Sequence, residues 1–252
     1  MIDRRELLEE ARERGLSLGM VEKDYVLGWL LFGFSGTDLV FKGGTALSKI
    51  FFPRIWRLSE DLDFSFSGKF EDLGDTNPNL SLVEEESGIK LELKSKYQNP
   101  EYLQLKIQYQ AVLGKNWAKV DVTREAVIEK ALVKPILKSY SDYPSYSVRV
   151  MGLEEVFSEK LRALLERKRS RDYYDIWRLL ALKTNENKVR KLFLAKCEVK
   201  GLGYEGSDQL LPANLEEMLK SYWERELSRL VYPVPDLREV IDQLGSGLGF
   251  LG

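Results

Sequence analysis

The chain has 252 residues, of which 44% are hydrophobic and 31% are charged, so it can bury the core of one large or two small globular domains. Its formal net charge is −2, so a nucleic-acid partner would have to be held by a local basic patch rather than by the whole surface. It contains no histidine and one cysteine, Cys197, which excludes histidine-dependent catalysis, histidine-ligated zinc and an internal disulfide framework.

The composition also bears on metals and location. Any metal ion must be held by oxygen ligands, which favours Mg²⁺ or Mn²⁺. The sequence shows neither a signal peptide nor an apolar run of about 18 residues, so we expect a cytoplasmic protein with no membrane partner.

Hydrophobic patterns and turn residues predict the elements in chain order. Helices are expected over residues 3–14 and 19–34, followed by a strand at 38–42, a Gly-Gly turn at 43–44, a short helix at 45–51 and a strand at 61–67. After an exposed loop at 68–80, strands are expected at 89–96, 102–113, 118–123 and 146–150, then helices from 153 to about 182 and through most of the remainder, with a loose tail at 245–252. This order predicts an α+β fold in two parts, with N-terminal helices and a core sheet at 1–150 and a mostly helical region at 151–252.

Acidic residues alternate with apolar ones in two of the predicted strands. In DLDFSF, Asp61, Asp63 and Ser65 share one face of the strand and the apolar residues take the other. In AKVDV, Lys119 and Asp121 lie opposite the apolar residues in the same way. A cation between three converging carboxylates would remove several kcal/mol of repulsion. We therefore predict that Asp61, Asp63 and Asp121 bind one or two Mg²⁺ ions.

The Gly43-Gly44 turn strengthens this prediction. A glycine turn that leads into a helix exposes backbone N–H groups that can cradle phosphates, and Thr45, the expected N-cap, adds a hydroxyl. A lone DxD is usually a solvated strand edge, and a lone Gly-Gly turn usually only connects two elements. The combination of the turn with three same-facing acids is what indicates a functional site.

The helix that begins at residue 153 carries cations on its apolar stripe. Lys160 and Arg167 fall on this stripe, and two explanations for Lys160 stay open. Its chain can pass along the apolar surface to solvent, or its amine can point at the acids or at a nucleotide phosphate. Further on, Arg171 and Asp175 have the spacing of an ordinary helical ion pair. The densest basic cluster, which is either a solvated helix junction or a grip on an RNA backbone, is Arg167, Lys168, Arg169 and Arg171.

Several of these motifs together resemble a known family. The segments GGTALSK, RLSEDLDF, KVD, EEVFSEK and RKRSRDYYD, with the opening helix VEKDYVLGWLL, are similar to the AbiEii/AbiGii nucleotidyltransferase-like proteins. That family includes toxins of type IV toxin–antitoxin and phage-abortive systems. The resemblance implies a DNA polymerase β-like nucleotidyltransferase fold, with a mixed sheet flanked by helices and a helical C-terminal region that contributes to the site.

The resemblance also implies roles for single residues. Asp61 and Asp63 would bind the metal, and Asp121 would be the third acid, which helps to activate the attacking hydroxyl. Lys160, with Glu155, matches the ExxxxK motif and is expected among the catalytic residues. The residues expected to bind the nucleotide are Gly43, Gly44, Thr45, Ser59, Lys119, Arg167, Arg171 and Asp172. Arg169 stands where the family motif has a lysine, which keeps the charge but not the geometry.

These expectations lead to a functional hypothesis with two rivals. The protein would transfer a nucleoside monophosphate from an NTP to an acceptor hydroxyl, with RNA, and tRNA 3′ ends above all, as the leading acceptor and a protein hydroxyl as another. A cognate antitoxin is a possible further partner. The rivals are an NTP-binding regulatory module without turnover and a metal-dependent nuclease, for which the Gly-Gly turn has no evident use.

Overall fold

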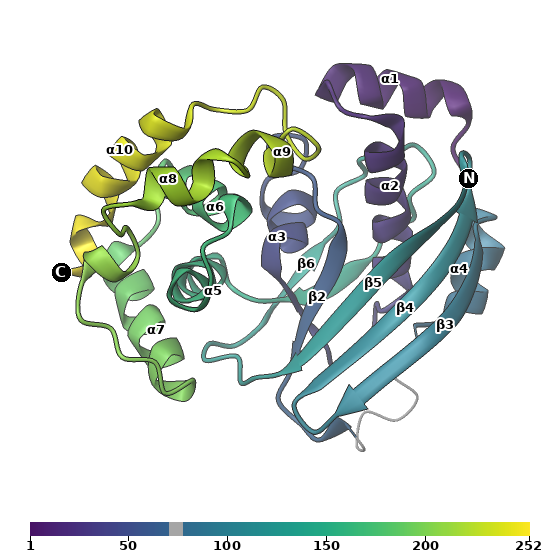
Figure 1. Ribbon diagram of the computed structural model, residues 1–252. Coiled ribbons are helices and arrows are strands. Elements are labelled where there is room, and N and C mark those ends of the chain that lie inside the picture. Colours follow the sequence, from purple (N-terminus) through teal and green to yellow (C-terminus); the bar gives the residue numbers. More distant parts are fainter. Residues whose placement is uncertain (71–77) are drawn as a thin grey trace. The chain divides into compact units, whose positions relative to one another are not determined.

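The computed structural model describes residues 1–70 and 78–252 (Figure 1). The chain divides into two compact units, Met1–Met151 and Gly152–Gly252, each with its own core of buried side chains. The first unit contains a mixed sheet with helices and the second is helical. Among the described residues, no helix is long and apolar enough to cross a membrane.

The first unit holds all the strands of the described chain. Its elements are α1 (Arg4–Arg14), α2 (Leu18–Gly33), β1 (Val40–Lys42), α3 (Gly43–Ala46), the π-helical turn η1 (Leu47–Phe51), β2 (Asp61–Phe66), α4 (Leu80–Ser87), β3 (Lys90–Asn99), β4 (Tyr102–Ala111), β5 (Gly114–Arg124), β6 (Leu132–Pro135) and β7 (Ser147–Val150). The strands form one sheet in the order β3-β4-β5-β2-β1-β7-β6. The β2/β5 and β1/β7 pairs are parallel and the other neighbours are antiparallel, so the sheet is mixed, as predicted.

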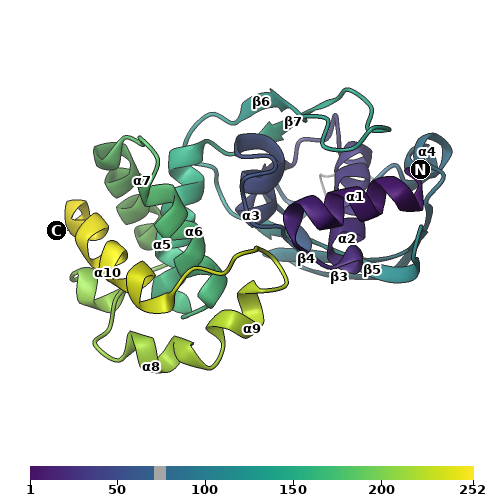
Figure 2. The same ribbon diagram turned by 90° about the horizontal axis from the view of Figure 1, so that it is seen from above.

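One face of the sheet forms the core of this unit. Alternation along the strands places apolar side chains on that face, where α2 contacts β2, β4 and β5 and α4 contacts β3. Figure 2 shows α1, α2 and α4 on one side of β3, β4 and β5. The apolar residues that line the core face of the three central strands are Leu62, Phe64, Leu103, Leu105, Ile107, Ala118, Val120 and Val122. The polar side chains of the same strands therefore lie on the opposite, open face.

A buried ion pair anchors the segment that follows β1. The Lys49 amine of η1 lies 2.8 Å from Oδ2 of Asp24 on α2, and both side chains are almost completely buried. The hydroxyl of Tyr140 donates a second hydrogen bond, of 3.0 Å, to the same carboxylate oxygen. Burial lowers the pKa of Lys49, and the Asp24 carboxylate opposes that effect. The pair fixes α3 and η1 against α2, which fixes the glycine turn at the start of α3.

Several predicted boundaries need correction. Thr45 does not cap the short helix: α3 begins at Gly43 with Lys42 at the N-cap, and the Thr45 hydroxyl donates to the carbonyl oxygen of Asp61 instead. Strand β5 begins at Gly114, where a tight hairpin from β4 extends it beyond its apolar run. Helix α4 was not predicted: it begins at Leu80, the last residue of the expected loop, and is capped by the side chain of Asn79. Residues 71–77 of that loop lie outside the described residues. Strand β6 was missed because its side chains are mostly exposed.

The second unit is built from helices around α5. Its elements are α5 (Leu153–Glu166), α6 (Ser170–Leu180), α7 (Glu186–Val199), the 3₁₀ turn η3 (Ser207–Gln209), α8 (Leu215–Lys220), α9 (Trp223–Leu227), α10 (Leu237–Gly247) and the 3₁₀ turn η4 (Leu248–Leu251). Helix α5 contacts α6 and α7, and α10 contacts α6, as Figure 2 also shows for α5. The expected loose tail at 245–252 is wrong, because α10 runs to Gly247 and Leu248 and Leu251 are buried.

Candidate active site

The glycine turn and the DLD strand meet at the end of β1. Gly43 has a φ of +75°, a conformation that favours glycine. A Cβ atom at Gly43 would lie 2.6 Å from Oδ2 of Asp63, so the carboxylate sits directly against the turn. A Cβ at Gly44 would lie 2.8 Å from Nη2 of Arg57 and 3.3 Å from Oγ of Ser59. Because neither glycine has a side chain, Asp63 can lie against Gly43, and Arg57 and Ser59 can lie against Gly44.

Strand register brings the predicted acids onto one face. In the antiparallel β1/β2 pair, Lys42 lies opposite Asp63. In the parallel β2/β5 pair, Asp61 lies opposite Lys119 and Asp63 lies opposite Asp121. Directly opposed residues of neighbouring strands share a face. The convergence of Asp61, Asp63 and Asp121 on one face of the sheet thus follows from this register.

Lys119 is the cation within this group. Its amine lies 2.9 Å from Oδ2 of Asp121 and 3.6 Å from Oδ2 of Asp61. Partial burial raises the pKa of Asp61, Lys119 opposes this, and Asp121 adds to it. The pKa of Lys119 is itself raised, because the two carboxylates outweigh the effect of burial. The acids therefore create a local field strong enough to hold a positive charge.

Two residues that the motifs did not point to hold Asp121 in place. The Tyr102 hydroxyl and Nε2 of Gln104 both donate to Oδ1 of Asp121, the latter at 2.9 Å. With Lys119 on its other oxygen, this carboxylate is held from two sides. Burial, together with the Asp121 carboxylate, raises the pKa of Tyr102 to about 12, so its hydroxyl stays a donor at neutral pH. The alternation in YLQLKIQYQ places both side chains on the polar face and was the available signal.

The donor set suits a hard cation bound through oxygen. Among residues 1–70 and 78–252, no three carboxylate, thiol or imidazole side chains are grouped closely enough to hold a metal ion by themselves. Mg²⁺ is usually held by only one or two carboxylates together with substrate phosphates and water, so a closed protein cage is not required. Asp61 and Asp63, close to the Gly43-Gly44 turn, fit that arrangement. Metal binding by these residues stays a prediction.

Arg57 is a further residue that the sequence did not single out as functional. Its side chain is almost fully buried, and Nη1 donates to the carbonyl oxygen of Leu58 at 3.0 Å, while Nη2 reaches the vicinity of Gly44. A buried guanidinium next to a turn of small residues is well suited to an anionic ligand. Arg57 stands between apolar residues in IWRLS, and this position was a sequence signal, because arginine is seldom buried unless it has a partner.

In the second unit, Lys160 lies within a cluster of buried acids. Its amine is 3.1 Å from Oδ1 of Asp172 and 2.9 Å from Oδ2 of Asp175. Nε of Arg167 lies 2.9 Å from the other oxygen of Asp172. Burial alone would raise the pKa of Asp172, but Lys160 and Arg167 outweigh it and hold that pKa far below its usual range. Asp172 has no exposed side-chain surface, so it positions the two cations.

Several other charged residues of this unit also have structural partners. Asp175, expected to pair with Arg171, binds Lys160. Arg169 lies 3.8 Å from Glu226, and Lys168 donates to backbone carbonyls. Glu155, for which the motif gave no physical role, lies 2.8 Å from the Lys196 amine of α7, and neither side chain has exposed surface. Nucleotide binding by Arg167 and Arg171 stays a prediction.

Comparison with known proteins agrees with this geometry. The family described as "Nucleotidyl transferase AbiEii toxin, Type IV TA system" matches residues 28–244. This chain belongs to the AbiEii family. It is a nucleotidyltransferase toxin of a type IV toxin–antitoxin system, which implies an NTP substrate and an antitoxin. The family expected from the motifs is thereby confirmed.

Solved structures show that the AbiEii chain has a nucleotidyltransferase toxin fold. It is similar to MenT4, a nucleotidyltransferase toxin from Mycobacterium tuberculosis H37Rv, with a TM-score of 0.74 and 22% identity over 100% of this chain and 90% of that one. It also resembles a candidate nucleotidyltransferase from H. pylori (TM-score 0.61, 18% identity, 94% and 96% covered) and JHP933 from Helicobacter pylori (0.59, 18%, 94% and 93%). Among curated proteins there is no significant match. The predicted fold class is confirmed.

Proposed function

We propose that this AbiEii protein transfers a nucleoside monophosphate from an NTP to a hydroxyl of an RNA acceptor, with tRNA 3′ ends as the leading candidate. The observation that carries the proposal is the β1/β2/β5 register, which sets Asp63 against the Gly43 turn and opposite Asp121. A phosphate-binding turn, a carboxylate beside it and a second carboxylate on the neighbouring strand are the groups that phosphoryl transfer needs.

The roles follow from position. Backbone N–H groups at the Gly43-Gly44 turn, with Ser59 and Arg57 close to Gly44, would bind the triphosphate. A divalent cation held by Asp61 and Asp63, together with phosphate oxygens, would neutralise the charge that develops on the triphosphate. Lys119, between Asp61 and Asp121, is placed to contact a phosphate oxygen as well.

Asp121 orients the attacking group. The acceptor oxygen forms a bond to the α-phosphorus, the bond from that phosphorus to the bridging oxygen breaks, and pyrophosphate leaves with that oxygen. The proton of the acceptor hydroxyl passes to the Asp121 carboxylate and then to water. Because Tyr102, Gln104 and Lys119 fix the position of this carboxylate, Asp121 acts mainly by holding the hydroxyl in line with the α-phosphorus.

A transfer assay tests the proposal. Purified protein is incubated with Mg²⁺, total tRNA and each α-³²P-labelled NTP in turn, beside Asp63→Asn and the control Asp38→Asn, whose carboxylate is 80% exposed on a surface ion pair. We expect label in RNA with the wild type and the control, none with Asp63→Asn, and loss of labelling with EDTA that returns on adding Mg²⁺.

Three outcomes would overturn the proposal. Transfer activity in Asp63→Asn would show that the Asp63 carboxylate is not needed. Shortening of the RNA without incorporation of label would indicate a nuclease. If the protein binds an NTP but releases no pyrophosphate, whichever acceptor is supplied, it is a regulatory module without turnover.

A further inference from the structure

The open face of β3, β4 and β5 continues outward from the proposed catalytic acids. Register places the polar side chains of β4 and β5 side by side on this face, in the pairs Gln104–Asp121, Lys106–Lys119, Gln108–Trp117 and Gln110–Lys115. On β3, Lys90 lies opposite Gln110 and Tyr97 opposite Gln104. From Lys115 to Asp121, β5 spans about 20 Å at the usual rise per residue of a strand. The face thus forms a continuous polar track that ends at Asp121.

Uncompensated positive charge lies on this track. Lys90, Lys106 and Lys115 are exposed, and none of their side-chain amines has a hydrogen-bond or ion-pair partner among the residues that the structure describes. In a chain with a net charge of −2, three such lysines on one face form a local basic patch. The basic cluster at residues 167–171 is not uncompensated in this way, because Arg167 and Arg169 both have carboxylate partners.

Aromatic rings stand on the same face. Trp117 is 43% exposed and Tyr97 is 58% exposed, which is unusual for large rings on strands that have a buried face available. The Tyr97 and Tyr102 rings are 6.4 Å apart, centre to centre, next to Asp121. Exposed rings among lysines on a sheet are the features with which proteins stack unpaired bases and hold their backbone.

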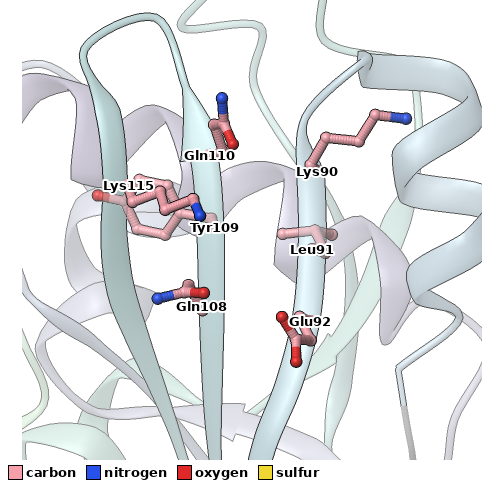
Figure 3. Close-up of a pocket in the computed structure, with 7 residues that line it drawn as sticks. All are labelled: Lys90, Leu91, Glu92, Gln108, Tyr109, Gln110 and Lys115. Atoms are coloured by element: carbon pink, nitrogen blue, oxygen red, sulfur yellow. The ribbon is translucent and has the colours of Figure 1, made fainter.

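A shallow hollow lies at the outer end of the track. It has a volume of about 290 Å³ and is lined by Lys90, Glu92, Gln108, Gln110 and Lys115 among others. Figure 3 shows Lys115 reaching from β5 toward β4, with Gln108 also between these two strands. Glu92, the one carboxylate among the described lining residues, is paired with Lys94. The amide and ammonium donors around the hollow suit the acceptor-rich edges of a nucleobase and its phosphate.

We propose that this open face of β3, β4 and β5 binds an unpaired RNA strand and leads its 3′ hydroxyl to Asp121. The inference rests on the proposed function for the delivery of the hydroxyl. An unpaired strand is favoured over a duplex because stacking on Trp117 and Tyr97 requires bases that are free of their own helix. It is favoured over an acidic protein because that partner would give the rings no comparable role.

Binding can be tested separately from transfer. Affinity for a fluorescently labelled RNA with an unpaired 3′ end, and for the same RNA closed into a blunt duplex, is measured by anisotropy over a range of salt concentrations. The variants are Trp117→Ala and Lys106→Gln/Lys115→Gln. The matched control is Lys130→Gln/Lys138→Gln, two exposed lysines that flank β6 at the opposite edge of the sheet.

The expected results are specific to each variant. Trp117→Ala should weaken binding of the unpaired RNA roughly 5- to 100-fold. Lys106→Gln/Lys115→Gln should reduce the slope of log affinity against log salt by about 1.4, because each lost phosphate contact removes about 0.7. The control should match the wild type, and the blunt duplex should bind more weakly than the unpaired RNA.

The outcomes distinguish this inference from the proposed function. If the wild type labels RNA but the face variants bind and label RNA as it does, the inference is overturned and the proposed function stands. If the wild type transfers nothing but its RNA binding falls in the variants as expected, the binding surface stands and the transfer proposal fails. Equal binding of duplex and unpaired RNA, or no RNA binding by the wild type, would overturn the inference.

Discussion

At the scale of single residues, the site depends on the absence of a side chain at residue 43. Gly43 lacks a Cβ, and the space that a Cβ would need is taken by the carboxylate of Asp63. The same residue adopts a φ of +75°. Backbone conformation and close approach therefore both require glycine at this position, for separate reasons.

A pair of glycine variants separates the two reasons. Gly36 has a φ of +83°, and no atom lies within 4 Å of the place that a Cβ would take there, so Gly36→Ala imposes the backbone strain alone. We expect Gly36→Ala to destabilise the protein by about 1–2 kcal/mol and Gly43→Ala by at least as much, because it also meets the Asp63 side chain. Only Gly43→Ala should also lose transfer activity by a large factor, because it displaces Asp63. Equal activities, measured by the transfer assay at a temperature where both variants are folded, would contradict this.

Tyr102→Phe tests how Asp121 is held. Removal of a hydrogen bond to the carboxylate should slow transfer about 10-fold, because Asp121 loses a donor that holds it in line with the acceptor hydroxyl. In the wild type, the Tyr102 hydroxyl stays protonated at neutral pH, since burial and Asp121 raise the pKa of Tyr102 to about 12. Tyr97→Phe is the control, because it keeps a neighbouring ring and removes a hydroxyl that does not contact Asp121. Equal transfer rates for the wild type and Tyr102→Phe would exclude the proposed role.

The sequence predicts on which strand face the site residues lie, but it does not predict which residues meet across strands. Alternation in DLDFSF and AKVDV is a local property, so the polar faces of both strands could be read directly. That Asp63 lies opposite Asp121 depends on the parallel β2/β5 register, which no local pattern specifies. The approach of Arg57 to Gly44 depends on the course of the chain between η1 and β2, which is irregular and carries no periodicity.

At the scale of elements, charged side chains hold the helices of the second unit together. Lys160 of α5 binds two aspartates of α6, and Lys196 of α7 binds Glu155 and Glu159 of α5. The apolar stripe of α5 was readable from its sequence, but the partners of its buried charges were not, because they come from other helices. Buried pairs of this kind are costly to break by removing one partner.

The pH dependence of stability tests the α5–α6 cluster. Because the folded-state pKa of Asp172 is depressed, its ionised form stabilises the fold above the ordinary pKa of 3.8, and that contribution is lost as pH falls below it. We expect Asp172→Asn to lower the free energy of unfolding by about 3 kcal/mol at pH 7. The difference from the wild type should be constant down to about pH 5 and shrink at lower pH. Denaturant titrations at several pH values measure it, with the exposed Asp38→Asn as a control that should show little change; a difference that grows on acidification would refute the assignment.

At the scale of the whole molecule, the chain is two compact units with different contents. The predicted metal ligands and the glycine turn belong to the first unit, and Lys160 and Arg167 belong to the second. Each unit has its own buried core, so local stability can differ between them.

Hydrogen exchange followed by mass spectrometry tests this division. Lys196→Met leaves Glu155 buried without its ammonium partner, so peptides from residues 152–252 should exchange faster, above all those of α5 and α7. Peptides from residues 1–151 should exchange as in the wild type. Lys188→Met is the matched control, because Lys188 also joins α7 to α5, through Glu154, but at a partly exposed position. Faster exchange throughout the chain would contradict the division into two units.

The parallel pairing of β2 with β5 has a consequence for synthesis of the protein. Asp63 and Asp121 are far apart in the chain, and the antiparallel strands β3 and β4 lie between β2 and β5 in the sequence. Contacts between distant segments form late, because a long loop must close before they stabilise anything. A growing chain that has exposed the glycine turn and β2 therefore still lacks the partner of Asp63. Under the proposed function, transfer therefore cannot begin on a growing chain until residues through Arg124 have emerged and β5 has paired with β2.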